Sequence, residues 1–253
     1  GAAAKQKILE ETLKQVADPK TKLMLQNAIQ ISEYAKVAVQ PEQGSNQPIA
    51  EANYDPNTGV MTVKKNGNDF AKIPEGYEIQ NDKGILTLTN KEGTDKSLQI
   101  GGYQVNVPQG ASVKYSEDKE GSATLQVSEG NAVIGKTSLN NLKDANIKID
   151  KNKQIEYAEF TSTKKSTYAF NYNNKNYIFN TNENSKVKFD PEKGELSGEN
   201  TNLKSGDSNL RGGFKVNLDE KGEFGKISLD ENSVYENKNK NLRVTSKDKF
   251  NIY

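Results

Sequence analysis

A short polar phrase that recurs between apolar, strand-like segments constrains this chain more than any other feature of its sequence. Each copy has an apolar residue, a turn-forming polar residue, a few charged residues and usually a Gly before the next apolar segment begins. Asp, Asn, Pro and Gly at such positions are typical of tight turns. The copies start between 25 and 40 residues apart, at Tyr54, Ile79, Tyr115, Ile149, Phe189 and Leu218.

Apolar and polar residues alternate between these turns, as in Tyr103–Val107 and Tyr168–Tyr172. This period of two indicates half-buried strands. A degenerate repeat built only of strands and turns predicts a mainly β fold, either an elongated β-solenoid or a repeat β-sheet. In such folds each repeat contacts only its neighbours, so the core is thin. That agrees with a hydrophobic fraction of only 32% in 253 residues, which is low for a compact domain of this size.

The first forty residues follow a helical period instead. Ile8, Leu9 and Leu13 have helical spacing, and so do Met24 and Ala28. The dipeptide at residues 18–19 is Asp-Pro, which suits the cap and first position of a helix. We expect a short α-helical segment of two amphipathic helices over 1–40 that caps one end of the strand region. The alternative is a helical arm whose apolar stripe docks elsewhere or on a partner.

A linker is predicted over 41–52, where Pro and Gly are frequent and apolar residues are scarce. The β-repeat or solenoid domain is predicted over 53–253, and it can continue beyond this sequence.

Composition excludes several functional classes. The 35 basic residues are balanced by 34 acidic residues, so no net field attracts nucleic acid or an anionic membrane. Cys and His are both absent, which removes thiol catalysis, His general bases and the usual zinc ligands. No apolar run reaches the length of a membrane span. We therefore expect no cofactor, no metal, no nucleic-acid partner and no membrane span.

Three short patterns have a chemical interpretation, and each also has a structural one. Residues 55–59 resemble the start of a calcium loop but lack its distal Glu, so they are interpreted as a turn. The S-x-x-K spacing of Ser162 and Lys165 recurs twice elsewhere and has no supporting motif. Acidic pairs such as Glu117 and Asp118 could serve a polysaccharide-cleaving groove, but they lie in predicted turns. No pattern here predicts an enzyme.

One cluster of aromatic residues is the candidate ligand or partner surface. If exposed, these side chains would form a stacking platform for sugars or a patch for a protein partner. If buried, they would form a core layer, which their regular alternation favours. The cluster consists of Tyr168, Phe170, Tyr172, Tyr177 and Phe179.

These features together predict a non-catalytic β-repeat module with a scaffold or adhesion function. An extracellular or cell-envelope location fits the absence of Cys, with a signal peptide removed or outside this sequence. Its partner would be a cell-surface or cell-wall component, a polysaccharide or another protein, and its oligomeric state is open. The alternatives are a carbohydrate-binding or polysaccharide-cleaving β-helix and an envelope lipid carrier with a β-groove.

Overall fold

The computed structural model describes residues 18–38 and 50–253. The first expected helix and residues 41–49 of the expected linker lie outside these ranges. Strands make up 62% of the structure, with one short helix in the described ranges, which confirms the mainly β class. The strands pair antiparallel and the sheet is not closed. The solenoid form remains a prediction.

The chain divides into two compact units, Gly1–Ala132 and Val133–Tyr253. The first described strand begins at Ala50, so the last residues of the predicted linker are strand instead. The first unit contains the helix α2 (Pro19–Ala38), strands β1 to β8 and most of β9. Its strands are β1 (Ala50–Asp55), β2 (Val60–Lys65), β3 (Asn68–Ile73), β4 (Tyr77–Asp82), β5 (Ile85–Asn90), β6 (Leu98–Ile100), β7 (Tyr103–Asn106), β8 (Ser112–Glu117) and β9 (Ala123–Ile134).

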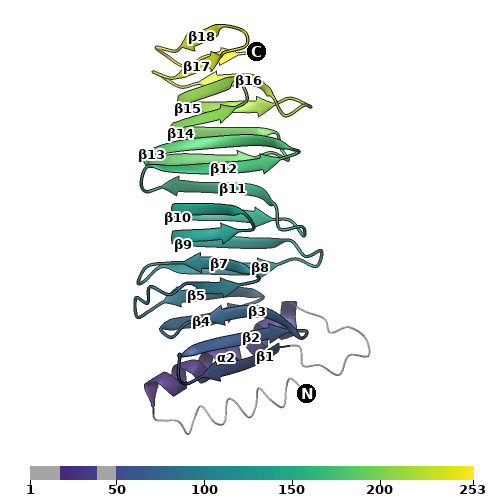
Figure 1. Cartoon of the computed structure of the whole chain (residues 1–253), viewed down its shortest axis with the longest axis vertical. Coiled ribbons are helices and arrows are strands. Elements are labelled where there is room, and N and C mark those ends of the chain that lie inside the picture. The colour runs from purple at the N-terminus through teal and green to yellow at the C-terminus, as the bar shows by residue number, and fades with distance from the viewer. Residues whose placement is uncertain (1–17, 39–49) are drawn as a thin grey trace. The chain divides into compact units, whose positions relative to one another are not determined.

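The strands of the first unit form two sets of paired strands, and successive segments of the chain add to the two sets in turn (Figure 1). One set runs β1–β2–β3–β6–β7–β9, and the other runs β4–β5–β8–β9. Alternate residues are buried in most of these strands, such as Met61 and Val63 in β2 and Leu86 and Leu88 in β5. The apolar alternation in the sequence therefore becomes the core of this unit, with charged residues on the outside.

Helix α2 forms because its first turn is capped and one face is apolar. The Asp18 carboxylate accepts hydrogen bonds from the Thr21 hydroxyl and the Thr21 backbone N–H, at 2.6 and 3.2 Å. These bonds lower the pKa of Asp18, which favours the charged form at the helix N-terminus. Leu25 and Ile29 lie one turn apart on the buried face. The helix packs on β4, β1 and β5.

The second unit has longer strands, several of which bend. β13 pairs with β12 through its first half and with β11 through its second half. The register shifts at the bends of β13 and β14, where Asn184 and Asn200 adopt positive φ. The strands are β10 (Thr137–Ile149), β11 (Ile155–Ser162), β12 (Ser166–Tyr172), β13 (Lys175–Asp190), β14 (Glu195–Ser205), β15 (Ser208–Leu218), β16 (Phe224–Leu229), β17 (Val234–Asn237), β18 (Leu242–Thr245) and β19 (Phe250–Ile252).

At these bends, buried hydroxyl groups form hydrogen bonds with backbone groups that have no partner in a neighbouring strand. The Ser185 hydroxyl accepts a hydrogen bond from the Asn182 backbone N–H at 2.8 Å, and it donates to the Asn200 carbonyl. The Thr201 hydroxyl donates to the Asn180 carbonyl at 2.8 Å. A bend leaves backbone groups without ladder partners, and burying them unpaired would be costly. Small hydroxyl residues at these positions make a bent, buried strand possible.

Three of the predicted turns share one hydrogen-bond pattern. In Asp118, Asp150 and Asp219, one carboxylate oxygen accepts from the backbone N–H groups two and four residues later, at 2.8 to 3.0 Å. In the turn at Asp55, the carboxylate accepts from the N–H of Asn57 at 2.9 Å. The carboxylates of this phrase therefore hold turns, as the sequence indicated.

Candidate binding cleft

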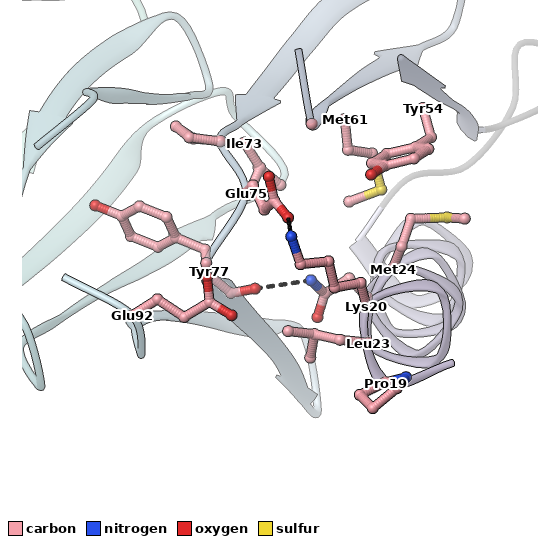
Figure 2. Close-up of a pocket in the computed structure, with 14 residues that line it drawn as sticks. Pro19, Lys20, Leu23, Met24, Tyr54, Met61, Ile73, Glu75, Tyr77 and Glu92 are labelled. Carbon is pink, nitrogen blue, oxygen red and sulfur yellow. Dashed lines mark hydrogen bonds and ion pairs between the residues drawn. The ribbon is translucent and has the colours of Figure 1, made fainter. Parts of the chain in front are cut away.

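A cleft of about 210 Å³ opens between helix α2 and strands β1, β2 and β3 in the first unit. Its lining comes from buried strand residues and from half-buried helix residues (Figure 2). Met61 and Ile73 are only 4% and 2% exposed, so they form the base. Leu23 and Met24 extend from α2, and Tyr54, 38% exposed, extends from β1. The walls are therefore mostly apolar, which is the lining expected of a small binding site.

The helix wall is fixed to the sheet by amide side chains. The side-chain amide of Asn27 donates to the Tyr77 carbonyl at 2.9 Å and accepts from the Ile79 N–H at 2.8 Å. One turn along the helix, the Gln30 side chain accepts from the Asn81 N–H at 2.8 Å. These amides take the place of a neighbouring strand along the outer edge of β4. They also hold the helix at a set distance from the cleft base.

Charged groups lie at the rim of the cleft. The Lys20 ammonium lies 2.9 Å from the Glu75 carboxylate, and Figure 2 shows this pair crossing the opening. The hydrogen bond to Glu75 raises the pKa of Lys20. Glu92 is a second carboxylate at the rim and is exposed. The apolar base and charged rim suit an apolar group that carries a polar or cationic end.

A glycine occupies the turn of the chain that lies next to the rim residue Glu75. Gly59 has φ of +73°, and a Cβ there would lie 2.6 Å from a Glu75 oxygen, so only Gly fits beneath Glu75. Positive-φ glycines then recur at Gly76, Gly93 and Gly110, each 17 residues after the previous one. The side chain just before each of these three glycines lies next to the glycine 17 residues earlier, as Glu75 lies next to Gly59. The turn phrase alone did not reveal this spacing, although the positions of Gly in the sequence contain it.

The structure places the predicted aromatic cluster mainly in the core of the second unit. Tyr168, Phe170, Tyr177 and Phe179 are at most 2% exposed, while Tyr172 is half-buried. The candidate ligand surface is therefore corrected for four of its five residues, which form the core layer that their alternation favoured. Strand alternation places all four side chains on one face, and the packing of that face buries them.

Within this layer, the buried tyrosine hydroxyl of Tyr168 has hydrogen-bond partners. The Tyr168 hydroxyl donates to the Asn140 carbonyl at 2.5 Å and is bonded to the Ser162 hydroxyl at 2.8 Å. The Ser162 hydroxyl also lies 2.7 Å from the Lys164 carbonyl. Phe170 stacks on Phe189 with ring centroids 4.5 Å apart. Ser162, the candidate from the S-x-x-K spacing, is therefore part of a buried structural network.

The second unit carries a separate, polar groove of about 500 Å³. Gly198 lines it, and a Cβ there would lie 2.3 Å from Thr201 and 2.8 Å from the Phe214 ring, so a larger residue cannot occupy this position. Charged side chains of both signs line the groove. They are Asp144, Glu159, Lys186, Lys188, Glu199, Lys215 and Asp230.

Comparison with family models, curated proteins and solved structures finds no match to this chain. Within residues 18–38 and 50–253, no helix has both the length and the apolar character needed to cross a bilayer. The cleft beside α2 therefore stands on its own geometry as the candidate functional site.

Proposed function

We propose that this chain is a non-catalytic scaffold or adhesion module of the cell surface or envelope, which attaches a partner protein through the cleft beside α2. The observation that carries the proposal is the apolar cleft itself. Its base is formed by buried Met61 and Ile73, and its opening is bordered by the Lys20–Glu75 ion pair.

The size of the cleft favours a side chain over a lipid. An apolar cavity of about 150 Å³ holds one benzene molecule. At about 210 Å³ the cleft suits one aromatic or branched aliphatic side chain, and it is small for a long acyl chain. Buried aromatic anchors are also the residues that contribute most to protein–protein binding. These points support attachment of a protein over the lipid-carrier alternative.

The chemistry of the lining favours binding without catalysis. Met24 and Met61 are flexible and polarisable, so they adapt to an inserted group. Lys20 is bonded to Glu75, and the raised pKa of Lys20 keeps it cationic rather than available as a base. In this proposal the ion pair and Glu92 orient the partner at the rim.

The two methionines allow a direct test, because Met24 and Met61 are the only methionines of the chain and both line the cleft. Protein labelled with ¹³C at the methionine methyl groups would be titrated with indole, which imitates an aromatic side chain. We expect saturable shifts of both methyl signals. Met24→Lys should abolish the shift of the Met61 signal, while Gln26→Lys, on the exposed side of α2, should leave it unchanged.

Parallel titrations separate the alternatives. Decanoate would be the lipid probe, and oligomers of N-acetylglucosamine would be the sugar probe. Saturable shifts with decanoate and none with indole would favour the lipid carrier. If none of the three probes moves either methyl signal, the cleft is not a binding site and the proposal fails.

The polar groove of the second unit supports carbohydrate binding as a second candidate function. Its charged side chains of both signs can hydrogen-bond to sugar hydroxyls. A glycan and cell-wall polysaccharide screen tests this candidate. Binding that is lost in Glu159→Gln but kept in Met24→Lys would assign sugars to the groove. Retention of the fold by each variant would be checked by circular dichroism.

A further inference from the structure

The last strands of the second unit present an uncovered sheet edge. β18 pairs with β17, and β19 pairs with β16, and neither has another strand partner in the described part of the chain. Leu242 in β18 and Phe250 in β19 are 41% and 48% exposed. Few large apolar side chains of the described residues are this exposed, so two of them on these last strands mark this end as a contact surface.

The free backbone groups of β18 can be assigned from the ladder. The Ser246 N–H donates to the Ser233 carbonyl at 2.8 Å, and these two residues lie directly beyond the Val234–Thr245 pair of the β17–β18 register. Antiparallel ladders alternate, so Leu242 and Val244 also direct their backbone groups toward β17. Arg243 and Thr245 then direct theirs outward, where a further strand can bind.

The outer edge of β4 in the first unit is covered, in contrast to the edge of β18. There the side chains of Asn27 and Gln30 occupy the backbone groups, and α2 covers the edge. β18 has no such cover among the described residues. An uncovered edge of this kind is a template for an added strand.

β1 also has a free strand edge, and it carries an exposed apolar side chain. It pairs with β2 on one side and has no other strand partner among the described residues, and Tyr54 is 38% exposed. Tyr54 and Ala52 lie opposite the buried residues Met61 and Val63, so they face the inner side. Val244 lies opposite buried Tyr235, so it also faces inward. A β1 strand placed beside β18 could thus continue the inner apolar row.

Charge selects β1 as the occupant of this edge. Residues 50–55 contain two acidic residues, Glu51 and Asp55, and no basic residue. Residues 238–249, which contain β18, hold five basic residues and one acidic residue. Two copies of β18 would repel each other, whereas β1 and β18 attract.

We propose that β1 of one copy adds to the outer edge of β18 of a second copy. The two patches differ, so the contact is heterologous, and a pair of bound copies keeps one free patch of each kind. Self-association can then continue beyond a dimer. This inference rests on the strand edges and does not depend on the cleft.

Sedimentation velocity over a range of protein and salt concentrations tests the proposal on the chain as it is. We expect species larger than a dimer that grow with protein concentration and shrink with added salt. Thr245→Pro removes an outward N–H and should weaken association about tenfold. Thr245→Val keeps that N–H and is the matched control. Circular dichroism would verify that both variants remain folded.

A charge exchange identifies the pairing strands. Glu51→Lys and Lys247→Glu should each weaken self-association, and an equimolar mixture of the two variants should restore it, because opposite charges again face each other. If the wild-type chain remains a monomer at millimolar concentration, the proposal is wrong. A dimer that neither Thr245→Pro nor the charge variants weaken would also overturn it.

Discussion

Two buried tyrosines of this chain differ in how their hydroxyl groups are satisfied. The Tyr34 side chain is fully buried, and its hydroxyl has no hydrogen-bond partner among the described residues. The Tyr168 hydroxyl is equally buried and is bonded to both Ser162 and the Asn140 carbonyl. A buried polar group without a partner costs free energy, while a bonded one stabilises the fold.

Opposite effects are expected when each hydroxyl is removed. Tyr34→Phe deletes an unpaired hydroxyl and should raise the free energy of unfolding by about 1 kcal/mol. Tyr168→Phe leaves the Ser162 network short of a partner and should lower it by about 1 to 3 kcal/mol. Urea denaturation of the two variants checks both values. A loss of stability in Tyr34→Phe would show that its hydroxyl has a partner in solution.

At the scale of the element, α2 functions as an edge cap for β4. Asn27→Ala leaves the Tyr77 carbonyl and the Ile79 N–H without partners in a buried place. We expect a loss of at least about 2 kcal/mol in the free energy of unfolding. Gln26→Ala, on the exposed side of the same helix, should change it little. Equal losses in the two variants would mean that helix propensity, and not the edge cap, sets the effect.

The recurring turns allow a second prediction at this scale. The Asp219 carboxylate accepts from the N–H groups of Lys221 and Glu223, at 2.8 and 3.0 Å. Asp219→Ala should destabilise the fold by about 1 kcal/mol, and Asp219→Asn should retain much of the stability because its amide oxygen still accepts. Glu220→Ala, at an exposed position of the same turn, is the control. Thermal unfolding of the three variants provides the comparison.

For the whole molecule, buried tyrosines predict a loss of stability in alkaline solution. Burial is the largest cause that raises the pKa values of Tyr34, Tyr77, Tyr115 and Tyr177. Above about pH 10 the unfolded chain releases these phenol protons while the folded chain retains them. The unfolded state then binds fewer protons, so stability falls as the pH rises, and the contribution is complete below that pH.

Urea denaturation at several values between about pH 8 and pH 11 measures this slope. Tyr34→Phe removes one of the tyrosines, so its stability should fall less steeply than that of the wild type. Ultraviolet absorbance of tyrosinate, followed in parallel, reports when the folded chain ionises. Ionisation of all tyrosines near pH 10 without unfolding would contradict the prediction.

Sequence alone was sufficient for the class of fold and for the turns. Alternation at Tyr168, Phe170 and Tyr172 identifies strands because side chains of a strand point to alternate faces. The Asp-to-Gly phrase identifies turns because its carboxylate and glycine satisfy the local backbone, as at Asp219. The same local rules place the start of α2 at Asp18 and Pro19. These features depend on neighbours within a few residues, so the sequence contains them.

Only the tertiary structure decided which faces are covered. The alternation of Tyr168, Phe170, Tyr177 and Phe179 is the same whether their shared face meets solvent or a core, and folding buries it. Likewise, the cleft brings Leu23 of α2 to Tyr54 and Ile73, which are far along the chain. Asn27 meets Tyr77 fifty residues away. Such contacts depend on how strands and helix pack, and no local pattern in the sequence specifies that packing.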